Sequence, residues 1–206
     1  MEEKRQYHSR AYHRYFEGYE ESRRVNDKGK LKIERVYVGH YFRQNIGDRE
    51  RILKRVLSFA LYLAVLGSFL FAVTLDIRCN KAWYVVSSTV LSFLAMMWLA
   101  ITLFFNLTAK REMEIRTLRD SSERFITASR LSFIFTALSA FAVAVHVTLN
   151  PGKDLPETIL CGVIFVLDSV MLFILYKMEK DLKYDVLPQK SGYIEKGYPI
   201  KYLAEF

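Results

Sequence analysis

Residues 82–109 read AWYVVSSTVLSFLAMMWLAITLFFNLTA and contain no charged side chain. A helix rises about 1.5 Å per residue, so about 20 apolar residues suffice to cross the roughly 30 Å hydrocarbon core of a bilayer. This stretch is longer than that, and its apolar residues occupy every face of a helix rather than one stripe. Such a helix either spans a membrane or lies in the core of a soluble protein. The rest of the chain decides between these two cases.

Three further runs have the same character. Residues 56–75 and 131–150 contain no charge, and residues 158–176 contain only Asp168. Four such helices in a chain of 206 residues leave too little sequence to cover them with soluble structure. The sequence therefore predicts an all-α membrane protein built as a four-helix transmembrane bundle. Its predicted spans cover about residues 54–75, 82–109, 127–150 and 156–178.

The charged residues lie almost entirely on one side of the predicted membrane. Of the 30 lysine and arginine residues, 27 lie before residue 56, in residues 110–130 or after residue 176, beside the apolar runs. Cytoplasmic loops carry such an excess, so we expect a multi-pass protein of the plasma membrane with both termini in the cytoplasm. Residues 1–50 hold no apolar segment of the signal-peptide kind, so the first span is expected to remain as an anchor. Orientation accounts for the net charge of +8, and we expect no nucleic-acid partner.

The predicted spans divide the chain into three parts. These are a cytoplasmic amphipathic and basic segment (1–50), the transmembrane bundle (51–178) and a cytoplasmic tail (179–206). In the first part, a stripe of residues at every fourth position predicts an amphipathic helix over residues 2–24, and it consists of Tyr7, Ala11, Tyr15 and Tyr19. Residues 31–38 predict a short strand or the start of another helix. Residues 110–123 are expected to continue the second and third spans as helices.

A weak internal repeat suggests that the bundle consists of two parallel hairpins. The triplet Leu-Ser-Phe at 57–59 recurs at 131–133, and Glu-Arg precedes each copy, at 50–51 and 123–124. A duplication of this kind would relate the hairpins by an axis along the membrane normal. Short matches between apolar segments also arise by chance, so both interpretations stay open.

Asp168 is the one charged residue within the four apolar runs 56–75, 82–109, 131–150 and 158–176. A carboxylate near the bilayer centre costs about 2.5–3.5 kcal/mol on insertion scales, so it normally faces protein or water and has a partner. Counting residues from the span boundaries places Ser92, Ser139 and Tyr62 at a similar depth. We therefore expect these four residues to form an intramembrane polar layer. It is interpreted either as a set of hydrogen bonds that hold the helices together or as a protonatable site on a translocation path.

A basic cluster precedes the first span, and two cysteines lie toward the outer side. The residues expected to contact lipid headgroups of an anionic inner leaflet are Arg49, Arg51, Lys54 and Arg55. Cys79 lies in the first outer loop, and Cys161 lies early in the fourth span. We expect two free thiols, although their placement on the same side also allows a disulfide.

The sequence contains no pattern typical of catalysis or metal binding. It has no glycine-rich phosphate loop and no Gly-x-Ser-x-Gly turn, and its four histidines are not spaced as metal ligands. We therefore expect no cofactor, no metal and no catalytic residue. The leading interpretation is a non-catalytic accessory or scaffold protein that binds a protein partner, or a second copy of itself, through its cytoplasmic face. The alternatives are a small proton- or solute-translocating oligomer centred on Asp168 and, with less support, a lipid-modifying membrane enzyme.

Overall fold

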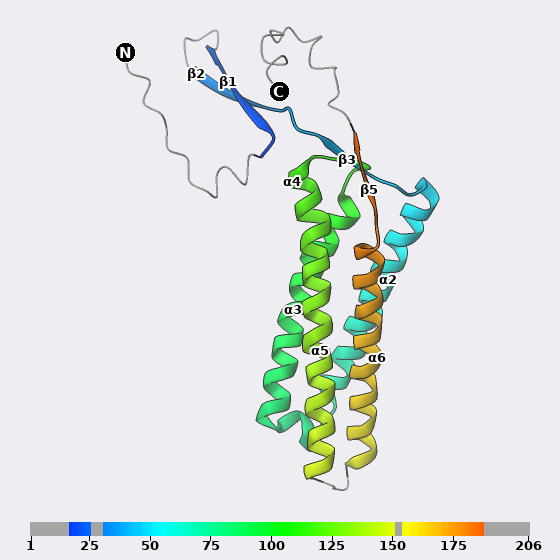
Figure 1. Ribbon diagram of the computed structural model, residues 1–206. Helices are drawn as coiled ribbons and strands as arrows, with labels where there is room; N and C mark the ends of the chain where they lie inside the picture. Colours follow the sequence, from blue (N-terminus) through cyan, green and yellow to red (C-terminus); the bar gives the residue numbers. More distant parts are fainter. Residues whose placement is uncertain (1–16, 26–30, 151–153, 188–206) are drawn as a thin grey trace. The chain divides into compact units, whose positions relative to one another are not determined.

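The chain forms two compact units in the computed structural model (Figure 1). The described residues are 17–25, 31–150 and 154–187, without the side chains of 20–25 and 31–36. The larger unit is helical and comprises residues 45–110 and 118–183. The smaller unit contains all the described strands, which come from three separate segments of the chain. Most of the predicted tail, from residue 188 onward, lies outside the described residues.

Four long helices make up the larger unit. Their bounds are Asp48–Thr74 (α2), Trp83–Thr108 (α3), Arg124–Leu149 (α5) and Leu155–Lys180 (α6). Two short elements directly precede α5. They are α4 (Ile115–Leu118) and the π-helical turn η2 (Arg119–Glu123). Each long helix has the length and apolar composition needed to cross a membrane. The prediction of four long apolar helices is confirmed, and the first begins earlier than predicted, at Asp48.

Successive long helices run in opposite directions (Figure 1). α5 packs against both α3 and α6, and α2 packs more extensively on α6 than on α3. At one end the connections are short: residues 75–82, with the 3₁₀ turn η1 (Arg78–Lys81), join α2 to α3, and residues 150–154 join α5 to α6. The antiparallel order therefore places the start of α2, the end of α3, the start of α5 and the end of α6 at the other end.

Buried residues recur every three or four positions along each long helix, so they form one face that packs against the other helices. In α6 the buried face includes Cys161, Phe165, Asp168, Leu172, Leu175 and Glu179. The outward faces carry large apolar side chains, including Phe104 at 64% exposure and Phe141 at 65%. Soluble monomers rarely expose a large contiguous apolar surface. The outer face of this bundle is suited to lipid hydrocarbon.

Three short strands form one sheet in the smaller unit. They are β3 (Tyr41–Gln44), β4 (Glu112–Met113) and β5 (Tyr184–Leu187). β3 is central and pairs antiparallel with both neighbours, so Phe42 is in register with Met113 on one side and with Val186 on the other. The chain is therefore mostly helical, and the all-α prediction is wrong for these segments.

A β-hairpin replaces part of the amphipathic helix predicted over residues 2–24. β1 (Tyr19–Val25) pairs antiparallel with β2 (Leu31–Tyr37) along its whole length. Gly18, just before β1, has a φ of 79°, a left-handed conformation that interrupts a helix. A Cβ there would lie 2.8 Å from the Tyr37 ring, so the close approach also requires glycine. The helix prediction is wrong where β1 lies. Of the two alternatives for residues 31–38, strand or helix, the structure has the strand. Residues before 17 lie outside the described ones.

The connection between α3 and α5 differs from the two continuing helices predicted over residues 110–123. α3 ends at Thr108, and the chain enters β4 within a few residues. Helical structure resumes only at Ile115 and then runs through η2 into α5. The prediction is wrong on the α3 side because arginine side chains from α2 bind the last carbonyl groups of α3, as described below.

Candidate functional site

The first polar grouping lies in the middle of the bundle and is centred on Asp168. The carboxyl group of Asp168 is fully buried (0% exposed), and its Oδ1 accepts a hydrogen bond of 2.5 Å from the Ser68 hydroxyl of α2. The hydroxyl groups of Ser92 on α3 and Ser139 on α5 hydrogen-bond to each other at 2.9 Å. All four helices of the bundle thus contribute a polar side chain to its interior.

The register of α5 against α6 shows that these contacts lie at a similar level. Two contacts fix this register, that of Gly162 on α6 with Val143 on α5 and that of Phe173 with Phe133. Asp168 lies midway between Gly162 and Phe173 along α6. The midpoint between their partners along α5 falls between Thr136 and Ser139. We call Asp168, Ser68, Ser92, Ser139, Thr136 and Ser132 the Asp168 layer.

Three buried oxygen atoms of the Asp168 layer have no hydrogen-bond partner among the described residues. They are Oδ2 of Asp168, Oγ1 of Thr136 and Oγ of Ser132, and all three residues are 0% exposed. Most buried polar atoms in proteins are hydrogen-bonded, and each one that is not costs about 1–3 kcal/mol. The layer therefore has unused hydrogen-bonding and ligand-binding capacity.

The structure brings together part of the polar layer that the sequence predicts. Ser92 and Ser139 bond directly, whereas Tyr62 donates to the carbonyl oxygen of Met96 at 3.3 Å. The partner of Asp168 is Ser68, which the sequence analysis did not select. Its signal was its position at the edge of the buried face of α2, three residues after Val65 and one before Phe69.

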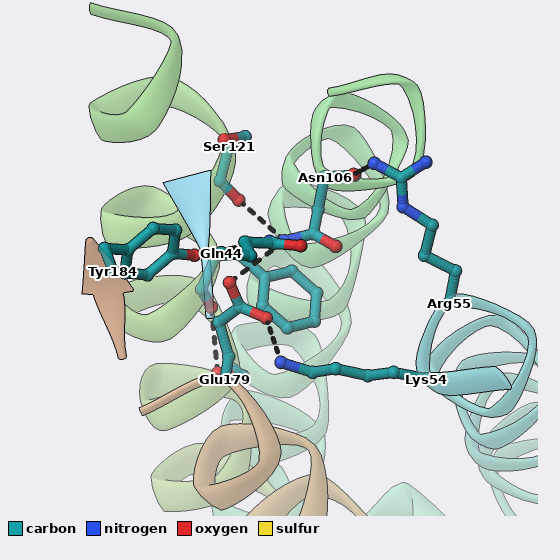
Figure 2. Close-up of polar contacts among 9 residues, drawn as sticks. Gln44, Lys54, Arg55, Asn106, Ser121, Glu179 and Tyr184 are labelled. Atoms are coloured by element: carbon teal, nitrogen blue, oxygen red, sulfur yellow. Dashed lines mark hydrogen bonds and ion pairs between the residues drawn. The ribbon is translucent and has the colours of Figure 1, made fainter. Parts of the chain in front are cut away.

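The second polar grouping lies at the end of the bundle where α3 and α6 end, and we call it the Glu179 network. Glu179 is 2% exposed, its Oε2 binds Nζ of Lys54 at 2.8 Å, and its Oε1 accepts a hydrogen bond from Asn106 at 3.2 Å (Figure 2). Asn106 also donates to the carbonyl oxygen of Ser121 at 3.1 Å. One anion and one cation thus neutralise each other and link α2, α3, η2 and α6.

Two arginines of α2 bind the carboxyl end of α3. Arg51 donates to the carbonyl oxygen of Ala109 at 2.6 Å, and Arg55 donates to the same oxygen and to that of Asn106 at 3.2 Å. The last carbonyl groups of a helix lack partners within the helix and attract cations. The headgroup role of the basic cluster stays a prediction. The structure adds protein partners for these two arginines and for Lys54, while Arg49 is exposed.

Both cysteines are buried free thiols. Sγ of Cys161 lies 3.8 Å from the carbonyl oxygen of Ala72 and 4.0 Å from Oδ1 of Asn80. Burial raises the pKa of Cys79, in η1, to about 11. Because the thiolate is the nucleophilic form, Cys79 is a poor nucleophile at neutral pH. The structure contains no disulfide between these two residues.

The smaller unit contains a cluster of tyrosine rings. Tyr37 is 5% exposed, and its ring centroid lies 5.1 Å from that of Tyr19 and 5.2 Å from that of Tyr41. The Tyr37 hydroxyl accepts a hydrogen bond from the Ile115 backbone N–H at 3.1 Å, and the Tyr19 hydroxyl donates to Glu114. Burial raises the pKa values of both Tyr19 and Tyr37 above the ordinary value, so both hydroxyls stay protonated. These contacts join the hairpin to the segment that carries β4.

Glu179 is the site residue that the sequence analysis missed most clearly. The sequence predicts it to lie in the cytoplasmic tail, because the uncharged run of the fourth span ends before it. The available signal was its spacing, since it follows Leu172 and Leu175 on the buried face of α6 at intervals of three and four residues.

No group of three or more His, Cys, Asp and Glu side chains in the described ranges is placed to hold a metal ion. No protein-family model, curated protein or solved structure matches this chain. Its function must therefore be argued from these sites themselves.

Proposed function

We propose that the protein is a non-catalytic accessory or scaffold protein of the plasma membrane whose smaller unit binds a protein partner in the cytoplasm. The observation that carries this proposal is the sheet of β3, β4 and β5. Its strands come from the segments before α2, between α3 and α5, and after α6. These three segments leave the bundle at the same end, and they build one folded unit rather than three separate loops.

The distribution of charge supports the proposed orientation. The three segments that contribute strands belong to the parts of the chain that hold 27 of the 30 lysine and arginine residues. Such an excess is typical of the cytoplasmic side. The exposed Arg49 is suited to an anionic inner leaflet. The connections at residues 75–82 and 150–154 are short and offer a large outer ligand little surface.

The accessory role is tested by isolating the full-length protein from its native membrane in a mild detergent. Gly18→Val places a branched side chain at a left-handed φ against the Tyr37 ring and is expected to disrupt the smaller unit. Gly67→Val is the matched control, because an added Cβ at Gly67 in α2 meets nothing within 4 Å. A partner at fixed stoichiometry should accompany the parent and Gly67→Val and be lost from Gly18→Val. A chain that purifies alone and moves protons or a solute after reconstitution would contradict the accessory role.

A second candidate function is translocation of a proton or small solute by an oligomer centred on Asp168. The observation that favours it is the unpaired Oδ2 of this fully buried carboxyl group. The test is flux into liposomes that contain the purified protein. Translocation requires a flux that Asp168→Asn abolishes and that the control Ser169→Ala retains, since the Ser169 hydroxyl bonds only to the Phe165 carbonyl of its own helix. The accessory role instead predicts flux equal to that of empty liposomes.

A further inference from the structure

The unpaired oxygen atoms of the Asp168 layer define a possible ligand site within the bundle. Oδ1 of Asp168 is occupied by the Ser68 hydroxyl, whereas Oδ2 has no partner among the described residues. The register of α5 against α6 places Thr136 at the level of Asp168, and Ser132 lies about one helical turn away from it on the same buried face. A carboxylate oxygen and two hydroxyl groups, all buried, thus lie unpaired on facing helices.

No basic side chain of the described helices is buried beside Asp168: Arg130, two residues from Ser132 on α5, is exposed. Lys54 lies nearly four helical turns from Ser68 along α2 and is already paired with Glu179. His146 lies more than two turns above the layer on α5, and its Nδ1 contacts the Tyr84 hydroxyl at 2.8 Å. The polar side chains of the layer are therefore one carboxyl group and hydroxyl groups only.

An oxygen-only donor set of this kind selects hard cations over nitrogen- and sulfur-seeking ones. One carboxylate balances a single positive charge, whereas a divalent ion would leave an excess charge in an apolar bundle. A water molecule would pair the hydroxyl groups but leave the carboxylate charge unbalanced. A proton on Oδ2 would also balance that charge and would turn Oδ2 into a hydrogen-bond donor, so it is the competing occupant that the experiment must distinguish.

We propose that the Asp168 layer binds one sodium ion, held by the Asp168 carboxylate and the hydroxyl groups of Ser68 and Thr136. The site goes beyond the accessory role and does not depend on it. The ion neutralises the buried charge and uses two of the three unpaired oxygen atoms, Oδ2 of Asp168 and Oγ1 of Thr136. Folding of the bundle is then linked to sodium, because the ion binds the folded state and not the unfolded chain.

The test compares thermal unfolding of the purified full-length protein in sodium chloride and in choline chloride at equal ionic strength and pH 8. At sodium concentrations about a hundredfold above Kd, linkage predicts a rise of about 5–10 °C in Tm. Asp168→Asn should abolish this rise and Thr136→Val should reduce it. Thr108→Val is the matched control, because the exposed Thr108 hydroxyl bonds only to carbonyl groups of its own helix.

Direct binding of radioactive sodium to the parent protein keeps the proposal testable if Asp168→Asn does not fold. We expect saturable binding of one ion per chain at pH 8, weakened by Thr136→Val and displaced as the pH falls, because protons compete for the carboxylate. The other titratable or charged groups on the facing helices nearest this layer are Arg130, which is exposed on α5 two residues from Ser132, and Tyr62, His146 and Cys161, each more than one turn away. The proposal is overturned if sodium shows no saturable binding and leaves Tm unchanged. It is equally overturned if Tm depends on pH alone, which would identify a proton as the only occupant.

Discussion

At the scale of single residues, the two buried carboxyl groups of the described helices differ in how they are paired. Glu179 is paired with Lys54 and also bonds to Asn106, whereas Asp168 has one hydroxyl partner and one free oxygen. A buried ion pair with satisfied hydrogen bonds serves structure, and removing one partner leaves an uncompensated charge. A half-satisfied carboxyl group is the arrangement expected where a ligand or proton is exchanged.

Removing the anion of the Glu179 network should destabilise the bundle. We expect Glu179→Leu to lower the free energy of unfolding by about 3 kcal/mol, because the partly buried Lys54 ammonium loses its partner. The double variant Lys54→Met/Glu179→Leu should recover most of this loss, because no charge is then left unpaired. Denaturant titration followed by tryptophan fluorescence measures both, with the exposed Asp181→Asn as control. A double variant less stable than either single variant would contradict a simple ion-pair role.

The thiol of Cys79 should react slowly and with an unusual pH dependence. Burial raises its pKa to about 11, so only about one thousandth of it is thiolate at pH 8. In a Cys161→Ala variant, the rate of alkylation should rise about tenfold per pH unit between pH 8 and pH 10. The unfolded protein serves as control and should level off near the ordinary pKa of cysteine. A rate for the folded protein that levels off below pH 9 would show that the thiol is not buried.

At the scale of elements, the contact between α5 and α6 depends on a glycine. A Cβ added at Gly162 would meet Cγ1 of Val143 at 3.2 Å, whereas one added at Gly67 of α2 meets nothing within 4 Å. We expect Gly162→Leu to lower stability by about 1–3 kcal/mol, because overpacking forces the two helices apart. Gly67→Leu should leave the Tm unchanged within a few degrees. Equal effects of the two substitutions would argue against close packing at Gly162.

The helices could be predicted from sequence, and the strands mostly could not. An uncharged run long enough to cross a bilayer can be recognised from the local sequence alone. For this reason α3 agrees with the predicted span 82–109 to within one residue at each end. The strands β3, β4 and β5 have four, two and four residues, too few for an alternating pattern to be recognised. Their pairing depends on contacts between distant segments, which no local pattern encodes.

The polar layer could be predicted in part for a similar reason. Depth along a helix follows from counting residues, so Ser92 and Ser139 were correctly placed at one level. Which side chain faces Asp168 depends on the rotation and tilt of α2, and these are set by packing. The structure therefore selects Ser68 rather than Tyr62, although both lie in the same helix.

At the scale of the whole molecule, the proposed topology is open to a direct test. Alkaline phosphatase folds only outside the cytoplasm, so its fusion after Lys81, between α2 and α3, should be active. A fusion after Lys110, beyond the end of α3, should be inactive, and green fluorescent protein at the same position should fluoresce. Measuring activity per fusion protein in whole cells decides the orientation. Activity of the phosphatase after Lys110 but not after Lys81 would reverse it.

The order of the strands along the chain has a consequence for biosynthesis. The central strand β3 is made before any of the four long helices, whereas its longer partner β5 follows the last of them. Until α6 has been synthesised, β3 can pair only with the two residues of β4. The sheet is therefore completed last, when all four helices already exist. A partner that recognises this sheet would bind finished chains and ignore incomplete ones.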